Sequence, residues 1–217
     1  MSEFAERRRM MVDTQVRPSD VTKYPIIDAM LAVPREAFVP DAQVEGAYAD
    51  QNVPLGDGRV VVEARTLAKT LDALDINNDE LVLTVGCGLG YTAAVIARMA
   101  QMVIAVEEDE ALARDAAAQL LEVGADNAIV HPGALVSGAA EHGPYDVIFV
   151  EGAVETLPDS LLDQLKDGGR IAALFMSGSV GEVKIGYKSN GQTSWRFDFN
   201  ATAPVLPGFE AAKEFAL

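Results

Sequence analysis

The chain has 217 residues, of which 49% are hydrophobic, and its formal net charge at neutral pH is −16. This length and apolar content suit one domain with a substantial core, and the acidic balance argues against binding to nucleic-acid backbones, which needs clustered Lys and Arg. A single cysteine excludes intramolecular disulfides and cysteine-rich metal sites, and we expect no metal. No apolar stretch reaches the ~20 residues of a membrane helix, and no signal peptide is recognisable, so we expect a cytoplasmic protein without a membrane partner.

The N-terminal part of the chain predicts short helices and irregular connections. Helices are expected over Glu3 to Val12 and Pro25 to Ala32, where apolar residues recur at helical spacing. The basic run Arg7-Arg8-Arg9 is interpreted as the exposed face of the first helix. Pro34 and Pro40 then break the chain. An irregular arm, a turn, a short extended piece and an amphipathic helix are expected next, over 42–54, 55–58, 59–62 and 64–74.

From residue 81 onward, strand and helix patterns alternate, which predicts an α/β fold with a doubly wound, mostly parallel sheet. The expected strands are 81–85, 102–106, 127–131, 145–150 and 170–175, and the expected helices are 91–100, 109–122 and 157–166. Alternation over 183–188 and 193–200 across an Asn190-Gly191 turn predicts a C-terminal antiparallel hairpin. We expect a single domain in which 1–76 form a helical, substrate-side extension and 77–217 form the core and hairpin. In the segment Ala201 to Leu217, whose role the pattern leaves open, the apolar residues Val205, Leu206 and Phe209 fit packing on the sheet.

The most informative segment runs from Val82 to Tyr91, where an apolar strand feeds a glycine-rich turn that opens into a helix. Glycines permit positive φ and let a ligand approach the backbone closely, while an adjoining helix start offers free N–H groups. The spacing Gly86, Gly88, Gly90 lacks the third glycine of a dinucleotide fingerprint, whose place is taken by Tyr91. The spacing favours a cradle for S-adenosylmethionine, although a tight turn in an ordinary βα unit explains a glycine turn about as often.

A second feature favours a nucleoside ligand. Glu107 ends the strand 102–106 and lies ~20 residues after Gly86, the distance at which a carboxylate binds ribose hydroxyls in a βαβ unit. The alternative is a solvated acid at a helix start, which is the interpretation we give to Glu108.

The remaining reactive side chains have structural interpretations. Cys87 lies inside the glycine turn with no activating basic residue near it in the sequence, which favours a packed cysteine over a nucleophile. His131 and His142, which are the two histidines of the chain, are interpreted as a strand end and a loop residue.

Several segments resemble one family, the protein-L-isoaspartate O-methyltransferases. The resemblance covers roughly residues 20 to 175, and its more specific part is N-terminal, because the glycine turn and the Gly168-Gly169 turn occur across methyltransferases generally. The segments that carry it are Val33-Pro34-Arg35-Glu36-Ala37-Phe38-Val39-Pro40, Ala47-Tyr48-Ala49-Asp50, Pro54-Leu55-Gly56, the Gly86 to Tyr91 turn with Ala93-Ala94-Val95, Tyr145-Asp146-Val147-Ile148, and Gln164-Leu165-Lys166-Asp167-Gly168-Gly169-Arg170.

The resemblance implies a Rossmann-like class I methyltransferase fold and methyl transfer from S-adenosylmethionine to a carboxylate of an isoaspartyl residue in damaged protein. It also implies roles for particular residues. The cofactor side comprises Thr84, Gly86, Cys87, Gly88, Leu89, Gly90, Glu107, Ala134 and Leu135, and the substrate side comprises Asp50, Val62 and Arg65. Arg65 replaces a neutral residue of the family, so it either attracts the substrate carboxylate or is a solvated arginine at a helix start.

Three positions depart from the family's pattern. Val62 stands where the family has a hydroxyl residue on the substrate side, Thr84 where it has an acid supporting the donor's amino group, and Ala134 where it has an Asp on the adenine. Each lost hydrogen bond to a buried ligand group costs ~1–3 kcal/mol. Two alternatives therefore stay open: a methyltransferase for another acceptor, and a non-catalytic S-adenosylmethionine-binding regulatory protein.

Overall fold

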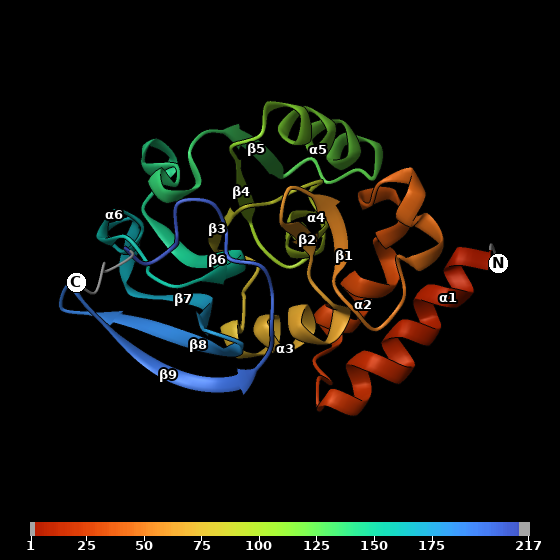
Figure 1. The fold of residues 1–217 in the computed structure, drawn as a ribbon, viewed down its shortest axis with the longest axis horizontal. Coiled ribbons are helices and arrows are strands. Elements are labelled where there is room, and N and C mark those ends of the chain that lie inside the picture. The colour runs from red at the N-terminus through yellow and green to blue at the C-terminus, as the bar shows by residue number, and fades with distance from the viewer. Residues whose placement is uncertain (1–2, 213–217) are drawn as a thin grey trace, which may run out of the picture.

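The computed structural model describes residues 3–212, and Figure 1 shows a central twisted sheet with helices around it. The strands are β1 Val53–Gly56, β2 Arg59–Val61, β3 Leu81–Val85, β4 Met102–Glu107, β5 Ala128–Pro132, β6 Tyr145–Val154, β7 Leu165–Ser177, β8 Val180–Ser189 and β9 Gln192–Asn200. The α-helices are α1 Glu3–Met11, α2 Tyr24–Ala32, α3 Ala64–Leu74, α4 Tyr91–Ala97, α5 Glu110–Glu122 and α6 Asp159–Asp163. A π-helical turn, Val12–Val16, continues α1, and short 3₁₀ segments lie at Arg17–Ser19, Arg35–Phe38, Asp41–Gly46, Leu135–Ser137 and Ala140–His142.

The main sheet has the order β5-β4-β3-β6-β7-β8-β9. The first five of these strands are parallel, whereas β8 and β9 are antiparallel additions. The strand order reverses between β3 and β6, and ligands of open α/β sheets bind outside the carboxyl ends of strands at such a point. The glycine turn begins directly after β3, at this switch point.

The two faces of the sheet are covered by different elements. Val82 and Val103 point into one apolar layer, which Leu67 of α3 and Val95 of α4 complete. The intervening residues, such as Leu83, point into the opposite layer, which contains Leu161 of α6 and Leu206 of the C-terminal segment. The alternation follows from the period of two along a strand and explains why these strands read as nearly continuous apolar runs.

Two of the hairpins in residues 3–212 close on a pair of residues with positive φ. Asp57 and Gly58 have φ of 46° and 73° between β1 and β2, and Asn190 and Gly191 have 52° and 74° between β8 and β9. Pairs of positive φ suit the two-residue turns whose twist matches that of the strands. The predicted C-terminal hairpin is confirmed, and the predicted extended piece at 59–62 is the second strand of the β1–β2 hairpin.

Several element boundaries differ from those predicted by local pattern. The helix expected over 157–166 is the shorter α6, which begins after Pro158, while β7 begins at Leu165 because this residue pairs with Tyr145 of β6. The arm expected over 42–54 contains the 3₁₀ segment Asp41–Gly46 and the start of β1. Pairing with a neighbouring strand is nonlocal and therefore overrides the local pattern.

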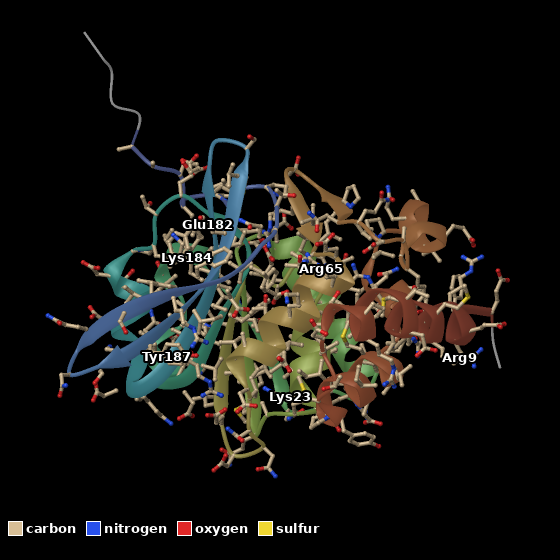
Figure 2. All side chains as sticks on the ribbon, turned by 90° about the horizontal axis from the view of Figure 1, so that it is seen from below. Arg9, Lys23, Arg65, Glu182, Lys184 and Tyr187 are labelled. Carbon is tan, nitrogen blue, oxygen red and sulfur yellow. The ribbon has the colours of Figure 1, made fainter. Side chains whose placement is uncertain are left out.

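The basic run at 7–9 is only partly the exposed surface that the sequence suggested. Arg9 is exposed, as Figure 2 shows. Arg8 is largely covered: its Nε donates to Tyr48 Oη at 2.9 Å and its Nη2 lies 3.1 Å from Glu36 Oε1. The Tyr48 hydroxyl also donates to Glu36. This triad ties α1 to the segments that follow α2.

Arg35 is the largest charged side chain in the core and is 1% exposed. Its Nε donates to the carbonyl of Ala47 at 2.7 Å, its Nη2 donates to the carbonyl of Val62 at 2.8 Å, and its guanidinium lies 4.8 Å from the centre of the Tyr91 ring. Arg35 therefore connects the N-terminal extension, the segment after β2 and the first residue of α4.

Within residues 3–212, no helix is long and apolar enough to cross a membrane.

Candidate functional site

The glycine turn has the backbone that its sequence predicted. Gly86, Gly88 and Gly90 have φ of 85°, 55° and 94°, in the region that other residues rarely occupy. The amides of Gly86 and Cys87 both donate to the carbonyl of Val106 in β4. The turn is thus held against the end of β4, where Glu107 follows.

Glu107 is fully buried, and its carboxylate is bound by an arginine that sequence reasoning missed. Arg59 donates from Nη1 to Oε1 at 2.9 Å and from Nη2 to Oε2 at 2.8 Å. The carboxylate also accepts hydrogen bonds from the backbone amides of Gly88, Glu108 and Asp109. Binding of ribose by Glu107 stays a prediction, and it requires Arg59 to withdraw from the carboxylate.

The space above the turn is filled by side chains from two distant segments. A Cβ built on Gly86 would lie 3.1 Å from Arg59 Nη2 and 3.2 Å from Leu206 Cδ1, and one on Gly88 would lie 2.5 Å from Leu55 Cδ1. Leu55 and Arg59 belong to the β1–β2 hairpin, which lies near α4 and β3 in Figure 1. The glycines are therefore needed for close approach even to the protein's own side chains.

The C-terminal segment crosses the carboxyl edge of the sheet. Ala153 of β6 donates to the carbonyl of Pro204 at 3.0 Å and accepts from the amide of Leu206 at 2.9 Å, so that Val205 forms an isolated bridge with it. Leu206 and Phe209 are buried, which confirms that this segment packs on the sheet. The rest of the segment, residues 213–217, lies outside the described residues.

A second buried carboxylate lies at the same edge and was also missed. Glu151 follows Val150, which pairs with Val85, so Glu151 lies level with the start of the glycine turn. Its Oε1 and the hydroxyl oxygens of Thr84 and Thr92 are buried, and none of them has a well-formed hydrogen bond within the described part of the chain. Only the first part of the rule that selected Glu107 applies to Glu151: it is an acid directly after an expected strand, 145–150, but it lies far more than ~20 residues after Gly86.

These residues supply the groups that S-adenosylmethionine needs. The donor has an ammonium, a carboxylate, a sulfonium and a ribose diol, and the site offers buried carboxylates, unpaired hydroxyls and a glycine turn that tolerates close contact. A cleft of about 450 Å³ adjoins the turn and is lined by Leu55, Arg59, Glu108, Leu112 and Pro207, among others. These protein groups fit S-adenosylmethionine, provided that the side chains of Arg59 and Leu206 shift from their positions over Gly86.

The other predicted site residues have varied positions. Leu135 is buried and Ala134 is exposed after β5, and Leu89 is half-buried in the turn. Val62 is buried beside Gly152, in a cavity of about 20 Å³. Asp50 is exposed ahead of β1. The structure therefore brings Thr84, the three glycines and Glu107 together, with Val62 near the neighbouring strand β6.

Arg65 lies on the first turn of α3. In Figure 2 it is found between the N-terminal segments and the C-terminal hairpin, β8–β9. Its guanidinium lies 5.8 Å from the centre of the Phe199 ring and its Nη1 is 3.9 Å from Glu63 Oε1. The side chain is 41% exposed, so both interpretations of Arg65 remain compatible with its position.

Cys87 is buried, and burial raises the pKa of its thiol well above the ordinary value, with the nearby carboxylates of Glu151 and Glu107 adding to the shift. Because the thiolate is the reactive form, we expect no reaction with a disulfide reagent at pH 8 in the folded protein. The thiol should react completely once guanidinium unfolds the chain. Complete labelling in native buffer within a minute would contradict this interpretation.

The two histidines of the chain lie side by side. His131 and His142 have ring centres 5.5 Å apart, and one ligand atom from each, with one from Glu141, lie within 4.8 Å of one another. Such a set could accept a transition-metal ion. Glu141 and His142 are exposed, however, and within residues 3–212 neither imidazole has a hydrogen bond to orient it, as ligating imidazoles usually do.

Comparisons with known proteins agree with this geometry. The family model described as protein-L-isoaspartate(D-aspartate) O-methyltransferase matches residues 6–194. A protein-L-isoaspartate O-methyltransferase of Roseiflexus castenholzii is 34% identical over 88% of this chain and 87% of its own length. One of Methylorubrum extorquens is 41% identical over 77% of this chain and 73% of its own.

Solved structures share the fold at lower identity. A protein-L-isoaspartate O-methyltransferase superposes with a TM-score of 0.82 at 23% identity, covering 93% of this chain and 66% of that one. A Plasmodium falciparum protein assigned to the same activity, in complex with S-adenosyl-L-homocysteine, gives a TM-score of 0.79 at 19% identity and covers 92% and 97% of the two chains. With a family match that spans both the N-terminal extension and the cofactor-binding core, the chain belongs to the protein-L-isoaspartate (D-aspartate) O-methyltransferase family.

Proposed function

We propose that this protein transfers a methyl group from S-adenosylmethionine to the carboxylate of an isoaspartyl residue in a damaged protein. One observation carries the proposal: the family match covers residues 6–194, a range that includes the β1–β2 hairpin, the glycine turn and the acid at the end of β4. Enzymes of this family are S-adenosylmethionine-dependent methyltransferases. The substrate, an isoaspartyl residue in a damaged protein, belongs to this proposal.

The chemistry makes modest demands on the protein. S-adenosylmethionine supplies an electrophilic methyl group, and a carboxylate with an ordinary pKa near ~4 is already ionised at neutral pH, so no general base is needed. The chain has to hold the reacting oxygen in line and exclude water from the site. The glycine turn and Glu107 would hold the donor, whereas Leu55 and Leu206 would cover it.

The substrate side is proposed to lie at Asp50, Val62 and Arg65. Val62 supports this placement because it lines the small cavity beside Gly152, next to the edge where the donor would lie. Its apolar side chain cannot hydrogen-bond a substrate, so positioning there would rest on shape and on backbone groups.

A pair of matched peptides tests the proposal. We expect methyl transfer from labelled S-adenosylmethionine to a peptide with one isoaspartyl residue, and at least about a hundredfold less transfer to the same peptide with aspartate, because a repair enzyme has to discriminate between them. Arg65→Met belongs in the same assay: a rise in KM for the isoaspartyl peptide with unchanged kcat would support charge pairing with the substrate. Equal transfer to both peptides would instead favour a methyltransferase with another acceptor.

The three departures from the family's pattern favour a second candidate, a protein that binds the nucleoside without turnover. Val62, Thr84 and Ala134 lack the hydroxyl and carboxylate groups that the family has at these positions. Calorimetry with S-adenosyl-L-homocysteine distinguishes the two candidates when it is combined with the peptide assay. Tight binding with no methyl transfer to any offered carboxylate would favour the regulatory candidate, and absence of binding would contradict both.

A further inference from the structure

We propose that Glu151 is the anionic partner of the donor's ammonium group, so that the cofactor supplies a cation to a buried carboxyl group that has no ion pair within residues 3–212. The inference rests on the proposed function, because it assumes S-adenosylmethionine as the ligand. It assigns a binding residue that the sequence analysis did not select.

The placement of Glu151 supports this role. It lies at the switch point of the sheet, level with the glycine turn, and next to Gly152, over which Leu206 packs. Its side chain faces the hydroxyls of Thr84 on β3 and Thr92 on α4. Three buried oxygens thus converge on one place without a satisfied hydrogen-bond set. An ammonium has three donors and no acceptor, which is the complement of these oxygens.

The charges of Arg59, Glu107 and Glu151 also support an ammonium partner for Glu151. Arg59 acts electrostatically on both Glu107 and Glu151, but both of its terminal nitrogens, Nη1 and Nη2, donate to Glu107. If both acids are ionised, the cluster has one negative charge in excess. Buried charges are normally paired, so the described residues leave room for one further cation.

The titration of Glu151 is consistent with a missing cation. Burial raises its pKa to about 8, and Glu107 adds to the rise, while Thr92, Thr84 and Arg59 oppose it. Cys87, the other titratable group beside it, is neutral because its own pKa is raised. The free protein therefore holds a proton on Glu151 at neutral pH, and a bound ammonium would displace that proton.

Two ligands isolate the ammonium contact. S-adenosyl-L-homocysteine has the amino-acid group, whereas 5′-methylthioadenosine keeps the nucleoside and lacks it. In calorimetry at pH 8, Glu151→Gln should weaken binding of S-adenosyl-L-homocysteine at least tenfold and leave 5′-methylthioadenosine within about twofold. Gln is nearly isosteric with the protonated acid, so the variant should fold. The matched control is Glu182→Gln, on the C-terminal hairpin (Figure 2), which should change neither affinity.

Proton release gives an independent readout. At pH 7 the wild-type protein should release close to one proton per S-adenosyl-L-homocysteine bound, measured as the dependence of binding enthalpy on buffer ionisation enthalpy. Affinity should rise about tenfold between pH 6 and pH 7 and level off above pH 8, because the ionised carboxylate is the binding form. Glu151→Gln should remove both the proton release and the pH dependence.

The outcomes separate this inference from the proposed function. If wild-type protein binds S-adenosyl-L-homocysteine and Glu151→Gln binds it equally well, or if no proton is released, the role of Glu151 is overturned while the cofactor stands. If the wild-type protein binds neither ligand at any pH, the proposed function itself fails.

Discussion

Replacing Glu107 with alanine is expected to lower the free energy of unfolding by about 3–5 kcal/mol, the cost of breaking a buried ion pair from one side. The substitution leaves Arg59, which is 6% exposed, without its carboxylate partner. It also removes the acceptor of the amides of Gly88, Glu108 and Asp109. Urea unfolding followed by circular dichroism would measure the change. Because the same carboxylate is proposed to bind ribose, binding of S-adenosyl-L-homocysteine should be lost as well.

Two variants serve as controls for this result. Glu108→Ala, at the neighbouring exposed acid, should change stability by less than about 0.5 kcal/mol. The double variant Arg59→Met with Glu107→Leu should be more stable than Glu107→Ala, because replacing both charges by apolar groups removes the uncompensated arginine. A Glu107→Ala protein as stable as wild type would show that the ion pair contributes nothing to folding.

Replacing Arg35 with methionine is expected to lower the free energy of unfolding by about 2–4 kcal/mol, because two buried carbonyls lose their donor. These carbonyls belong to Ala47 and Val62, on either side of the β1–β2 hairpin. The substitution also removes the guanidinium that lies over the Tyr91 ring, so the loss combines the two hydrogen bonds with the cation–π contact. The hairpin should become accessible to proteolysis before the sheet unfolds.

Arg65→Met is the matched control, since Arg65 also lies over an aromatic ring but is 41% exposed. Its guanidinium can be replaced by water, so we expect a change within about 0.5 kcal/mol. Equal effects of the two substitutions would contradict the structural role assigned to Arg35.

The two hairpin turns and the glycine turn show which parts of this protein follow from local sequence. Asn190-Gly191 and the glycines at 86, 88 and 90 adopt positive φ, a conformation that these residue types permit at lower cost than others do. In contrast, α6 is shorter than its apolar pattern because Leu165 joins a neighbouring strand. That pairing depends on residues elsewhere in the chain and has no local signal.

The candidate site also combines residues that local sequence identifies with residues whose contacts depend on the fold. Glu107 could be selected because it ends a strand and lies ~20 residues after Gly86, whereas Glu151 follows the expected strand 145–150 but lies far beyond that spacing. Its link to Thr84 and Thr92 could not be read in this way, because it depends on the order of strands in the sheet. Arg59, the partner of Glu107, could not be identified from the sequence either. It lies 48 positions away, in a segment where the sequence predicted only a turn and a short extended piece.

The sequence by itself determined the order of strands and helices from β3 onward, the glycine turn at the switch point and the family to which the chain is similar, because periodicity and glycine placement act over a few residues. Only the tertiary structure decided which charges meet there. Burial makes an unpaired charge costly, and the packing that brings Arg59, Glu107 and Glu151 together determines that Arg59 pairs with Glu107 and not with Glu151.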